Sequence, residues 1–154
     1  MMKKRKQKKA EKIDPLARRW NAAVGKWKRV LWLTHWRIDT SIQDRQDATP
    51  NVSAATPASF GTIAQADTIS CYRQSEIKLT RGSIASKNPK EMNESACHEV
   101  LHVVVAPYDA MVQEMLMALP QEKREGFEKW HDQAKEELVT HLQNVFIYEE
   151  AHRA

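Results

Sequence analysis

A strong helix start lies in the middle of the chain, at Asn88-Pro89-Lys90-Glu91. Asn88 can cap the first turn, Pro89 suits the first helical position, and Glu91 can hydrogen-bond back to the capping residue. An apolar set then follows at helical spacing: Ala96, Cys97, Val100, Leu101, Val103 and Val104. The pattern predicts a mostly buried helix over 89–105 that ends before Pro107, because proline disfavours helix at the residue before it.

The same stretch contains His98-Glu99-Val100-Leu101-His102. Two histidines four residues apart on a helix project from one face, so both can bind a single metal ion. Glu99 points about 100° away, where it can contact a metal-bound water without binding the metal. The pattern predicts a zinc site with ligands His98 and His102. The alternative is a pair of hydrogen-bonded or solvent-facing histidines that binds no metal.

A catalytic zinc site also needs a third protein ligand. Six residues after His102, where an extended version of the motif has a third histidine, the chain has Tyr108. The acidic candidates are Asp109, close to the motif in sequence, and Glu136 and Glu137, which flank the apolar stripe of a later helix. An ordinary charged helix face is the alternative for these two glutamates.

The rest of the chain predicts helices on both sides of a short set of strands. The expected elements are a helix over 15–30, a strand over about 36–42, a loop over 43–61, two weaker strands near 62–70 and 72–79, a polar connection over 80–88, the central helix, a short helix over 109–119 and a last helix over about 120–148. Gly126 is a weak point of the last helix. This order predicts an α+β fold with a small, mostly antiparallel sheet.

Four of the five tryptophans fall within the first helix and strand: Trp20, Trp27, Trp32 and Trp36. Their spacings follow the helix and strand periods, which favours a place in the hydrophobic core. The alternative is an aromatic platform for a ligand.

The basic character of the chain is concentrated at its start. The 154 residues have a net charge of +4, whereas residues 1–12 alone carry seven basic side chains against one acid. We therefore expect a disordered basic tail over 1–12 and one domain over 13–154. The tail either contacts nucleic acid or an acidic surface, or simply keeps the chain soluble.

The sequence contains no apolar run of the roughly 18–20 residues that a membrane span requires. No apolar segment of a secretory signal follows the basic residues either. We therefore expect a cytoplasmic protein that does not bind a membrane, with Cys71 and Cys97 as reduced thiols.

The His98-Glu99-Val100-Leu101-His102 motif, followed by an acidic segment on a later helix, resembles the zincin metallopeptidases, in the gluzincin arrangement with a glutamate as third ligand. The compact layout over residues 15–148 is similar to minimal zincins of the ImmA/IrrE or SprT-like type, and to short metallopeptidases predicted in bacteriophages and prophages. The resemblance implies a minimal zincin fold, Zn²⁺ held by His98, His102 and Glu136, and Glu137 as the fallback ligand. It also implies that the protein acts in the cytoplasm of a bacterial or phage-infected host cell.

The resemblance also implies hydrolysis of a protein or peptide substrate. Glu99 would accept a proton from the zinc-activated water and pass it to the leaving amine. Candidate donors to the developing oxyanion are Tyr72, Tyr108, His131 and His141, each of which also has a structural explanation. The strand near 62–70 or 72–79 would offer its edge to an extended peptide.

Two other functions compete with peptide hydrolysis. In a non-catalytic zinc-binding accessory or regulatory protein related to phage, Glu99 would be dispensable. In a nucleic-acid-binding module, the basic tail over 1–12 would carry a steeply salt-dependent affinity.

Overall fold

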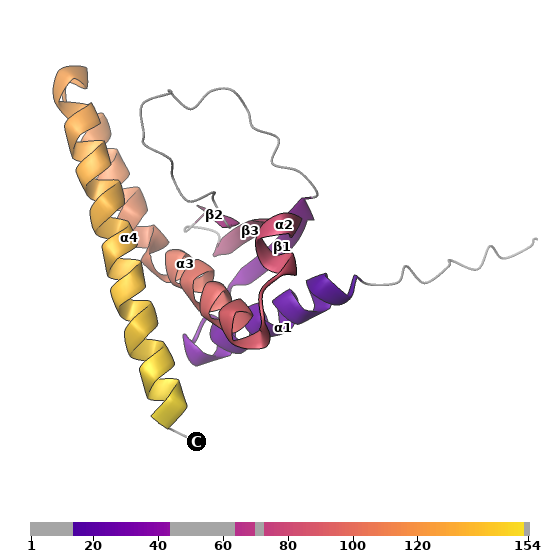
Figure 1. Ribbon diagram of the computed structural model, residues 1–154. Helices are drawn as coiled ribbons and strands as arrows, with labels where there is room; N and C mark the ends of the chain where they lie inside the picture. The colour runs from indigo at the N-terminus through magenta and orange to yellow at the C-terminus, as the bar shows by residue number, and fades with distance from the viewer. Residues whose placement is uncertain (1–13, 44–63, 70–72, 153–154) are drawn as a thin grey trace, which may run out of the picture.

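The computed structural model describes residues 14–43, 64–69 and 73–152 (Figure 1). Its elements are α1 (Pro15–Val30), β1 (Arg37–Gln43), β2 (Ala64–Ile69), β3 (Gln74–Thr80), α2 (Arg81–Ala85), α3 (Pro89–Met117) and α4 (Gln121–His152). The predicted α+β class is confirmed, and the first helix has the predicted bounds. The basic tail over 1–12, most of the predicted loop over 43–61, Cys71 and Tyr72 lie outside the described residues.

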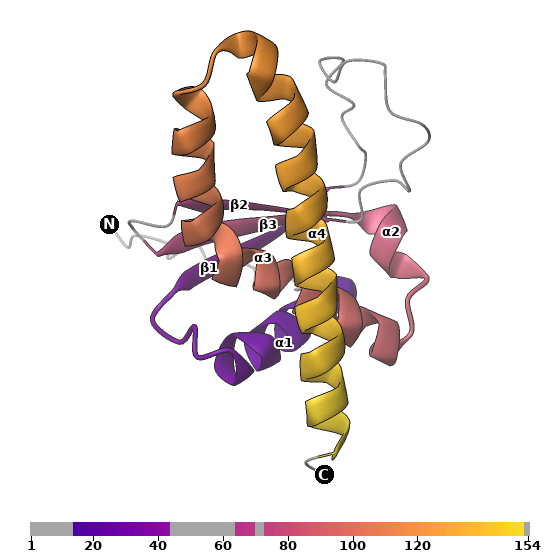
Figure 2. The same cartoon turned by 90° about the vertical axis from the view of Figure 1, so that its left-hand side faces the viewer.

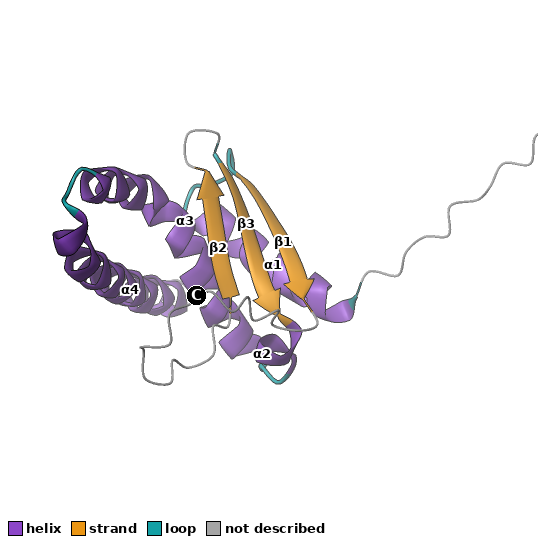
Figure 3. Cartoon of the chain, turned by 90° about the horizontal axis from the view of Figure 1, so that it is seen from above, coloured by secondary structure: helices purple, strands orange, loops and turns teal. Residues whose placement is uncertain are grey.

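The three strands form one sheet in the order β1-β3-β2 (Figure 3). β2 pairs with β3 antiparallel, from Ala64 opposite Leu79 to Ile69 opposite Gln74. β3 pairs with β1 in parallel, so the sheet is mixed rather than mostly antiparallel as expected. The reason is that β3 lies between β1 and β2 in the sheet. Because β2 runs opposite to both other strands, β3 is antiparallel to β2 but parallel to β1.

One face of the sheet is covered by helices. In Figure 3 α1 and the first part of α3 lie beneath the strands. Ser75, Ile77 and Leu79 of β3 are buried, whereas Glu76 is exposed, which is the alternation expected of a half-buried strand. Lys78, half-buried on the outer face, forms an ion pair with Asp67 of β2. The core therefore lies between the sheet and the α1–α3 layer.

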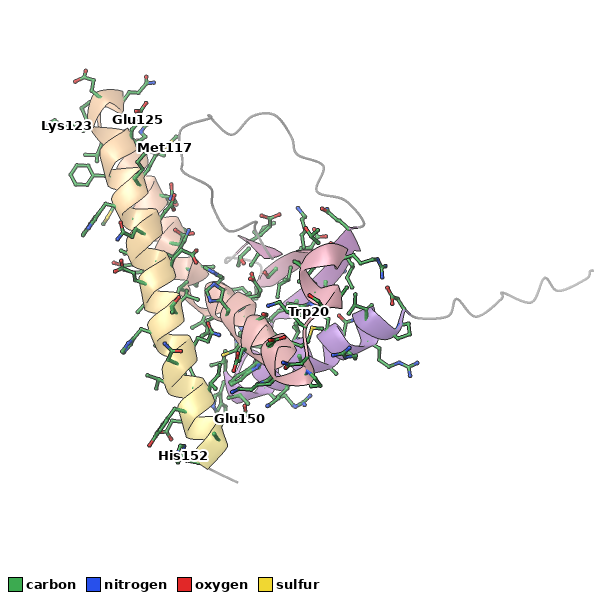
Figure 4. The ribbon with its side chains drawn as sticks, viewed as in Figure 1. Trp20, Met117, Lys123, Glu125, Glu150 and His152 are labelled. Carbon is green, nitrogen blue, oxygen red and sulfur yellow. The ribbon has the colours of Figure 1, made fainter. Side chains whose placement is uncertain are left out.

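Three of the four early tryptophans lie in this core, as predicted. Trp20 (labelled in Figure 4), Trp27 and Trp36 are buried. Trp27 donates its indole N–H to the backbone oxygen of Asn93 at 2.9 Å, which links α1 to α3. The prediction is wrong for Trp32, which is 84% exposed. Trp32 adopts a left-handed backbone conformation (φ 59°) in the turn after α1, and Leu33 takes the buried position instead.

The central helix begins as predicted. Asn88 accepts a hydrogen bond from the Glu91 backbone N–H at 3.0 Å, and the Glu91 carboxylate accepts one from the Asn88 N–H at 2.9 Å. The prediction that it ends before Pro107 is wrong, because α3 continues to Met117 with Pro107 inside it. Past the proline, Val112 and Leu116 line a pocket against α4, and this packing outweighs the roughly 3 kcal/mol that an internal proline costs.

The predicted separate helix over 109–119 is therefore the second half of α3. α3 bends along its length in Figures 1 and 2, as expected for a proline inside a helix. α4 runs through Gly126 without interruption and lies alongside α3. The polar connection expected over 80–88 contains one further short helix, α2. No described helix has a stretch that is long and apolar enough to cross a membrane.

Candidate metal centre

The two histidines of the motif and one of the candidate acids meet between α3 and α4. His98 and His102 lie one helical turn apart on α3, and Glu136 lies on the facing side of α4. Potential ligand atoms of these three residues all lie within 4.8 Å of one another. Among the described residues, this is the single cluster of three or more such side chains with that spacing.

The donor atoms of the three residues converge. The Nε2 atoms of His98 and His102 are 3.2 Å apart, and each lies 3.5 Å from a different oxygen of the Glu136 carboxylate, Oε2 for His98 and Oε1 for His102. Tetrahedral Zn²⁺ with bonds of about 2.0–2.1 Å requires its donors to lie about 3.4 Å from one another. Two imidazole nitrogens and a carboxylate oxygen are also a donor set that zinc binds. The donor chemistry therefore fits a zinc ion, and one donor atom from each residue lies within 4.8 Å of the others.

Gln143 of α4 orients one of the histidines. Its amide N–H donates to the backbone oxygen of Glu94 at 3.1 Å, so its oxygen faces Nδ1 of His98 at 3.0 Å and accepts a hydrogen bond. Nδ1 of His98 then carries the proton, and the lone pair on Nε2 points toward Glu136. Metal-binding histidines usually have such a partner on the second ring nitrogen. Gln143 was not predicted from the sequence, although it lies seven residues after Glu136 and thus on the same face of α4.

Glu99, the predicted general base, is a buried residue of α3. It lies one residue after His98 and is 7% exposed. Burial raises the pKa of Glu99, and the nearby His102 and His98 oppose that effect. A buried carboxylate with a raised pKa is a stronger base than an exposed one.

The ligand candidates also influence each other's protonation. Hydrogen bonding to His102 and His98 holds the pKa of the Glu136 carboxyl well below its usual range. The Glu136 carboxylate in turn raises the pKa of His98, with a smaller contribution from Gln143, while burial acts in the opposite direction. Without a metal, the Glu136 carboxylate therefore favours the protonated form of His98.

A cleft of about 190 Å³ opens beside His102. Ala66 and Thr68 of the edge strand β2 form one wall, and Ala106 and Ala110 of α3 form the other. Lys135, next to Glu136 on α4, also lines the cleft. Lys135 was not among the sequence-predicted site residues, because a lysine on a charged helix face carries no signal of its own.

The other two acids are not part of the ligand cluster, although Asp109 lines the cleft beside His102. Glu137 is exposed and accepts a hydrogen bond from Gln133 at 2.8 Å, so it is directed away from the histidines. Asp109 lies 2.6 Å from Nε2 of the buried His131, and 3.5 Å from the Lys135 ammonium. Neither acid belongs to the ligand cluster.

Of the described candidates for oxyanion donor, none lines the cleft. Tyr108 and His131 line a different groove between α3 and α4, and His141 is exposed on α4.

No protein-family model, curated protein or solved structure significantly matches the chain.

Proposed function

We propose that the protein is a zinc-dependent peptide hydrolase in which His98, His102 and Glu136 hold the metal. The observation that carries the proposal is the convergence of two imidazole Nε2 atoms, 3.2 Å apart, on one carboxylate whose two oxygens each lie 3.5 Å from one of them. The buried carboxylate of Glu99 follows His98 directly. A solvent-facing histidine pair explains neither the converging Glu136 nor the fixed orientation of His98 by Gln143.

Zinc bound there would polarise a carbonyl group and lower the pKa of a water molecule toward about 7. Glu99 accepts a proton from the water that attacks the carbonyl carbon, and delivers it to the nitrogen of the leaving amine. Burial raises the pKa of Glu99, which makes its carboxylate a stronger base for the first transfer. Lys135 lines the same cleft, where its ammonium would stabilise the negative charge that the carbonyl oxygen gains during attack, and Asp109, 3.5 Å from that ammonium, offsets part of its charge.

The edge strand β2 supports a peptide as the substrate. β2 pairs with β3 on one side, and it is the last strand of the described sheet on the other. Its residues Ala66 and Thr68 line the cleft beside His102. An extended peptide that adds to this edge by backbone hydrogen bonds would pass the candidate metal centre, and alanines on the cleft walls leave room for its side chains.

Metal content tests the ligand set. We expect one zinc per chain in the wild type and in Glu99→Gln, and loss of zinc in His98→Ala and Glu136→Ala, measured by elemental mass spectrometry after dialysis. Glu137→Ala is the matched control, because it removes the neighbouring carboxylate, which is directed away from the histidines. Equal zinc content in Glu136→Ala and Glu137→Ala would contradict the assignment of the third ligand.

Turnover tests the reaction. Hydrolysis of unfolded casein, followed by mass spectrometry of the fragments, is expected to fall by about 10²- to 10⁴-fold in Glu99→Gln while zinc is retained. A Glu99→Gln variant as active as the wild type would refute the role of Glu99. A wild type that holds zinc but cleaves no peptide would instead identify a non-catalytic zinc protein.

A further inference from the structure

A long apolar groove runs along α4. In Figure 2 the first half of α4 lies beside the second half of α3, and the second half of α4 lies beside α1. A cavity of about 290 Å³ lies between α3 and the first half of α4. A second cavity, of about 450 Å³, lies between the turn after α1, α3 and the second half of α4. The two cavities therefore follow one another along the same helix.

The two cavities form one groove, because the same faces of α3 and α4 line both. On α4, Leu138 of the first cavity and Leu142 and Val145 of the second follow at steps of four and three residues. On α3, Val104 of the second cavity and Tyr108 of the first are one helical turn apart. The lining residues of α3 extend over about four helical turns, roughly 22 Å. We call the two cavities together the outer groove, which is lined by residues 30–32, by α3 between 101 and 116 and by α4 between 127 and 150.

The outer groove exposes enough apolar surface for a stable protein interface. Six of its large apolar side chains are between 43% and 84% exposed: Trp32, Tyr108, Phe127, Trp130, Leu138 and Val145. With about 200 Å² as the full accessible surface of each, these six expose roughly 600–700 Å². Each partner of a standard-size complex buries about 800 Å², and a monomer rarely exposes an apolar patch of more than a few hundred.

Trp32 stands at the edge of the second cavity in an unfavourable backbone conformation. Its φ of 59° lies in the left-handed region, which bulky side chains rarely adopt. Leu33 fills the core position next to it, so the core does not require the Trp32 side chain. Such strained residues are concentrated at ligand-binding sites, which supports a binding role for this edge of the groove.

The two helices that form most of the outer groove are the acidic part of the molecule. α3 and α4 together carry 13 acidic and five basic side chains, a net charge of −8, although the whole chain has +4. Glu149 lines the second cavity, and Glu137 directly precedes Leu138 of the first. Neither carboxylate has an ion-pair partner among the described residues. The groove therefore offers uncompensated negative charge beside its apolar surface.

This charge selects the kind of partner. In a second copy bound through the same groove, two helix pairs of −8 would face each other and repel. A positively charged partner gains from the same field. The basic side chains near the groove change this little, because Lys135 pairs with Asp109, Lys26 of α1 pairs with Glu150, and Lys123 lies near the tip of the helix pair in Figure 4.

We propose that the outer groove binds a basic amphipathic helix of a partner protein. Apolar side chains at steps of three and four residues would enter the two cavities, and lysines or arginines beside them would approach Glu137 and Glu149. A length of four turns corresponds to a partner helix of about 15 residues. None of His98, His102 and Glu136 lines the groove, so the proposal is independent of the proposed function.

Binding of a synthetic helix to the full chain tests the proposal. The probe is a fluorescently labelled peptide of about 18 leucines and lysines, with leucine at steps of three and four residues, and its control has glutamate in place of every lysine. Fluorescence anisotropy is expected to give a Kd of about 10 µM or tighter for the lysine peptide, and an affinity at least about tenfold weaker for the glutamate peptide. Because the whole chain has a net charge of +4, general attraction does not favour the lysine peptide.

A polar substitution inside the groove tests where the peptide binds. Leu138→Gln is expected to weaken binding of the lysine peptide by about tenfold. Met117→Gln is the matched control, because it makes the same kind of change at an exposed apolar side chain of α3 that lines neither cavity. Circular dichroism establishes that both variants keep their helices.

A charge substitution tests the basic character of the partner. Glu137→Lys combined with Glu149→Lys is expected to weaken binding of the lysine peptide and to reduce its dependence on salt. The matched control, Glu122→Lys combined with Glu125→Lys, changes the net charge equally but lies at the start of α4, outside both cavities. It is expected to leave the Kd close to that of the wild type.

The wild type also reports binding directly. Trp32 and Trp130 are 84% and 69% exposed, whereas Trp20, Trp27 and Trp36 are already buried. The peptide contains no tryptophan, so a shift of the protein emission to the blue during titration reports cover over the groove. The shift and the Kd are expected to be the same with a metal chelator present, so they stand even if the proposed function fails.

Several results would overturn the proposal. They are an absence of binding at 100 µM protein, equal affinity for the two peptides, and equal affinity of Leu138→Gln and Met117→Gln for the lysine peptide. Sedimentation of the protein alone is expected to show a monomer of 17.8 kDa, and a dimer that Leu138→Gln dissociates would assign the groove to a second copy. Tenfold tighter peptide binding after deletion of residues 1–12 would assign it to the basic tail of the chain itself.

Discussion

Replacement of Gln143 by leucine provides a test of how the candidate metal centre is organised. The substitution keeps a side chain of similar size on α4 but removes the oxygen that lies 3.0 Å from Nδ1 of His98. The imidazole N–H then loses its partner, or the proton moves to Nε2, the atom that faces Glu136. Both outcomes weaken the donor set without touching a ligand.

The structure sets the size of the effect. A fully buried donor left without a partner costs about 1–3 kcal/mol, and a fully exposed one costs close to nothing because water replaces the partner. The side chain of His98 is 25% exposed, which places it toward the buried limit. We therefore expect a loss of about 1.4–2 kcal/mol in zinc binding, or roughly 10- to 30-fold in Kd.

Competition with a chelator of known zinc affinity at pH 7.5 measures this change. Asn144→Leu is the matched control, because it makes the same polar-to-apolar change at the next residue, which is exposed. Its Kd is expected to equal that of the wild type. If Gln143→Leu binds zinc as tightly as Asn144→Leu and both are folded, the proposed orientation of His98 by Gln143 is incorrect.

Three further predictions concern stability and protonation. Asn88→Ala removes the helix cap and is expected to lower the stability by about 1 kcal/mol, which thermal unfolding detects as a fall of roughly 2–4 °C in Tm; an unchanged Tm would contradict it. Cys97 is fully buried and desolvation raises its pKa to about 12, so mass spectrometry should find it unmodified by iodoacetamide at pH 8 in the native protein and modified in urea. In chelator-treated protein, the raised pKa of His98 stabilises the fold below about pH 6.5, and the lowered pKa of Glu136 stabilises it above about pH 4.5. The Tm difference between wild type and Glu136→Gln should be largest between these two pH values, and it should shrink as the pH rises through the raised pKa of His98. A Tm difference that stays constant from pH 5 to 9 would show that the interaction between His98 and Glu136 does not stabilise the fold.

The features that the sequence predicted correctly are local ones. The cap at Asn88 and the four-residue spacing of His98 and His102 depend only on the geometry of a single helix. The start of α1 and the alternation in β3 have the same local origin. Predictions failed where a distant contact outweighed a local preference. Pro107 lies inside α3 because packing against α4 holds the helix together, and Trp32 points outward because Leu33 occupies the core position.

The sequence alone determined that His98, Glu99 and His102 share one helix, and helical periodicity brings the two histidines, four residues apart, to the same face. Only the tertiary structure decided which acid on α4 joins the two histidines. Glu136 and Glu137 are adjacent in sequence, and only the register of α4 against α3 places the first within 3.5 Å of both imidazoles and directs the second away. The same register sets Gln143 behind His98, and the insertion of β3 between β1 and β2 leaves β2 as the edge beside the cleft. These contacts join segments far apart in the chain. They depend on how the whole core packs, so no local sequence pattern predicts them.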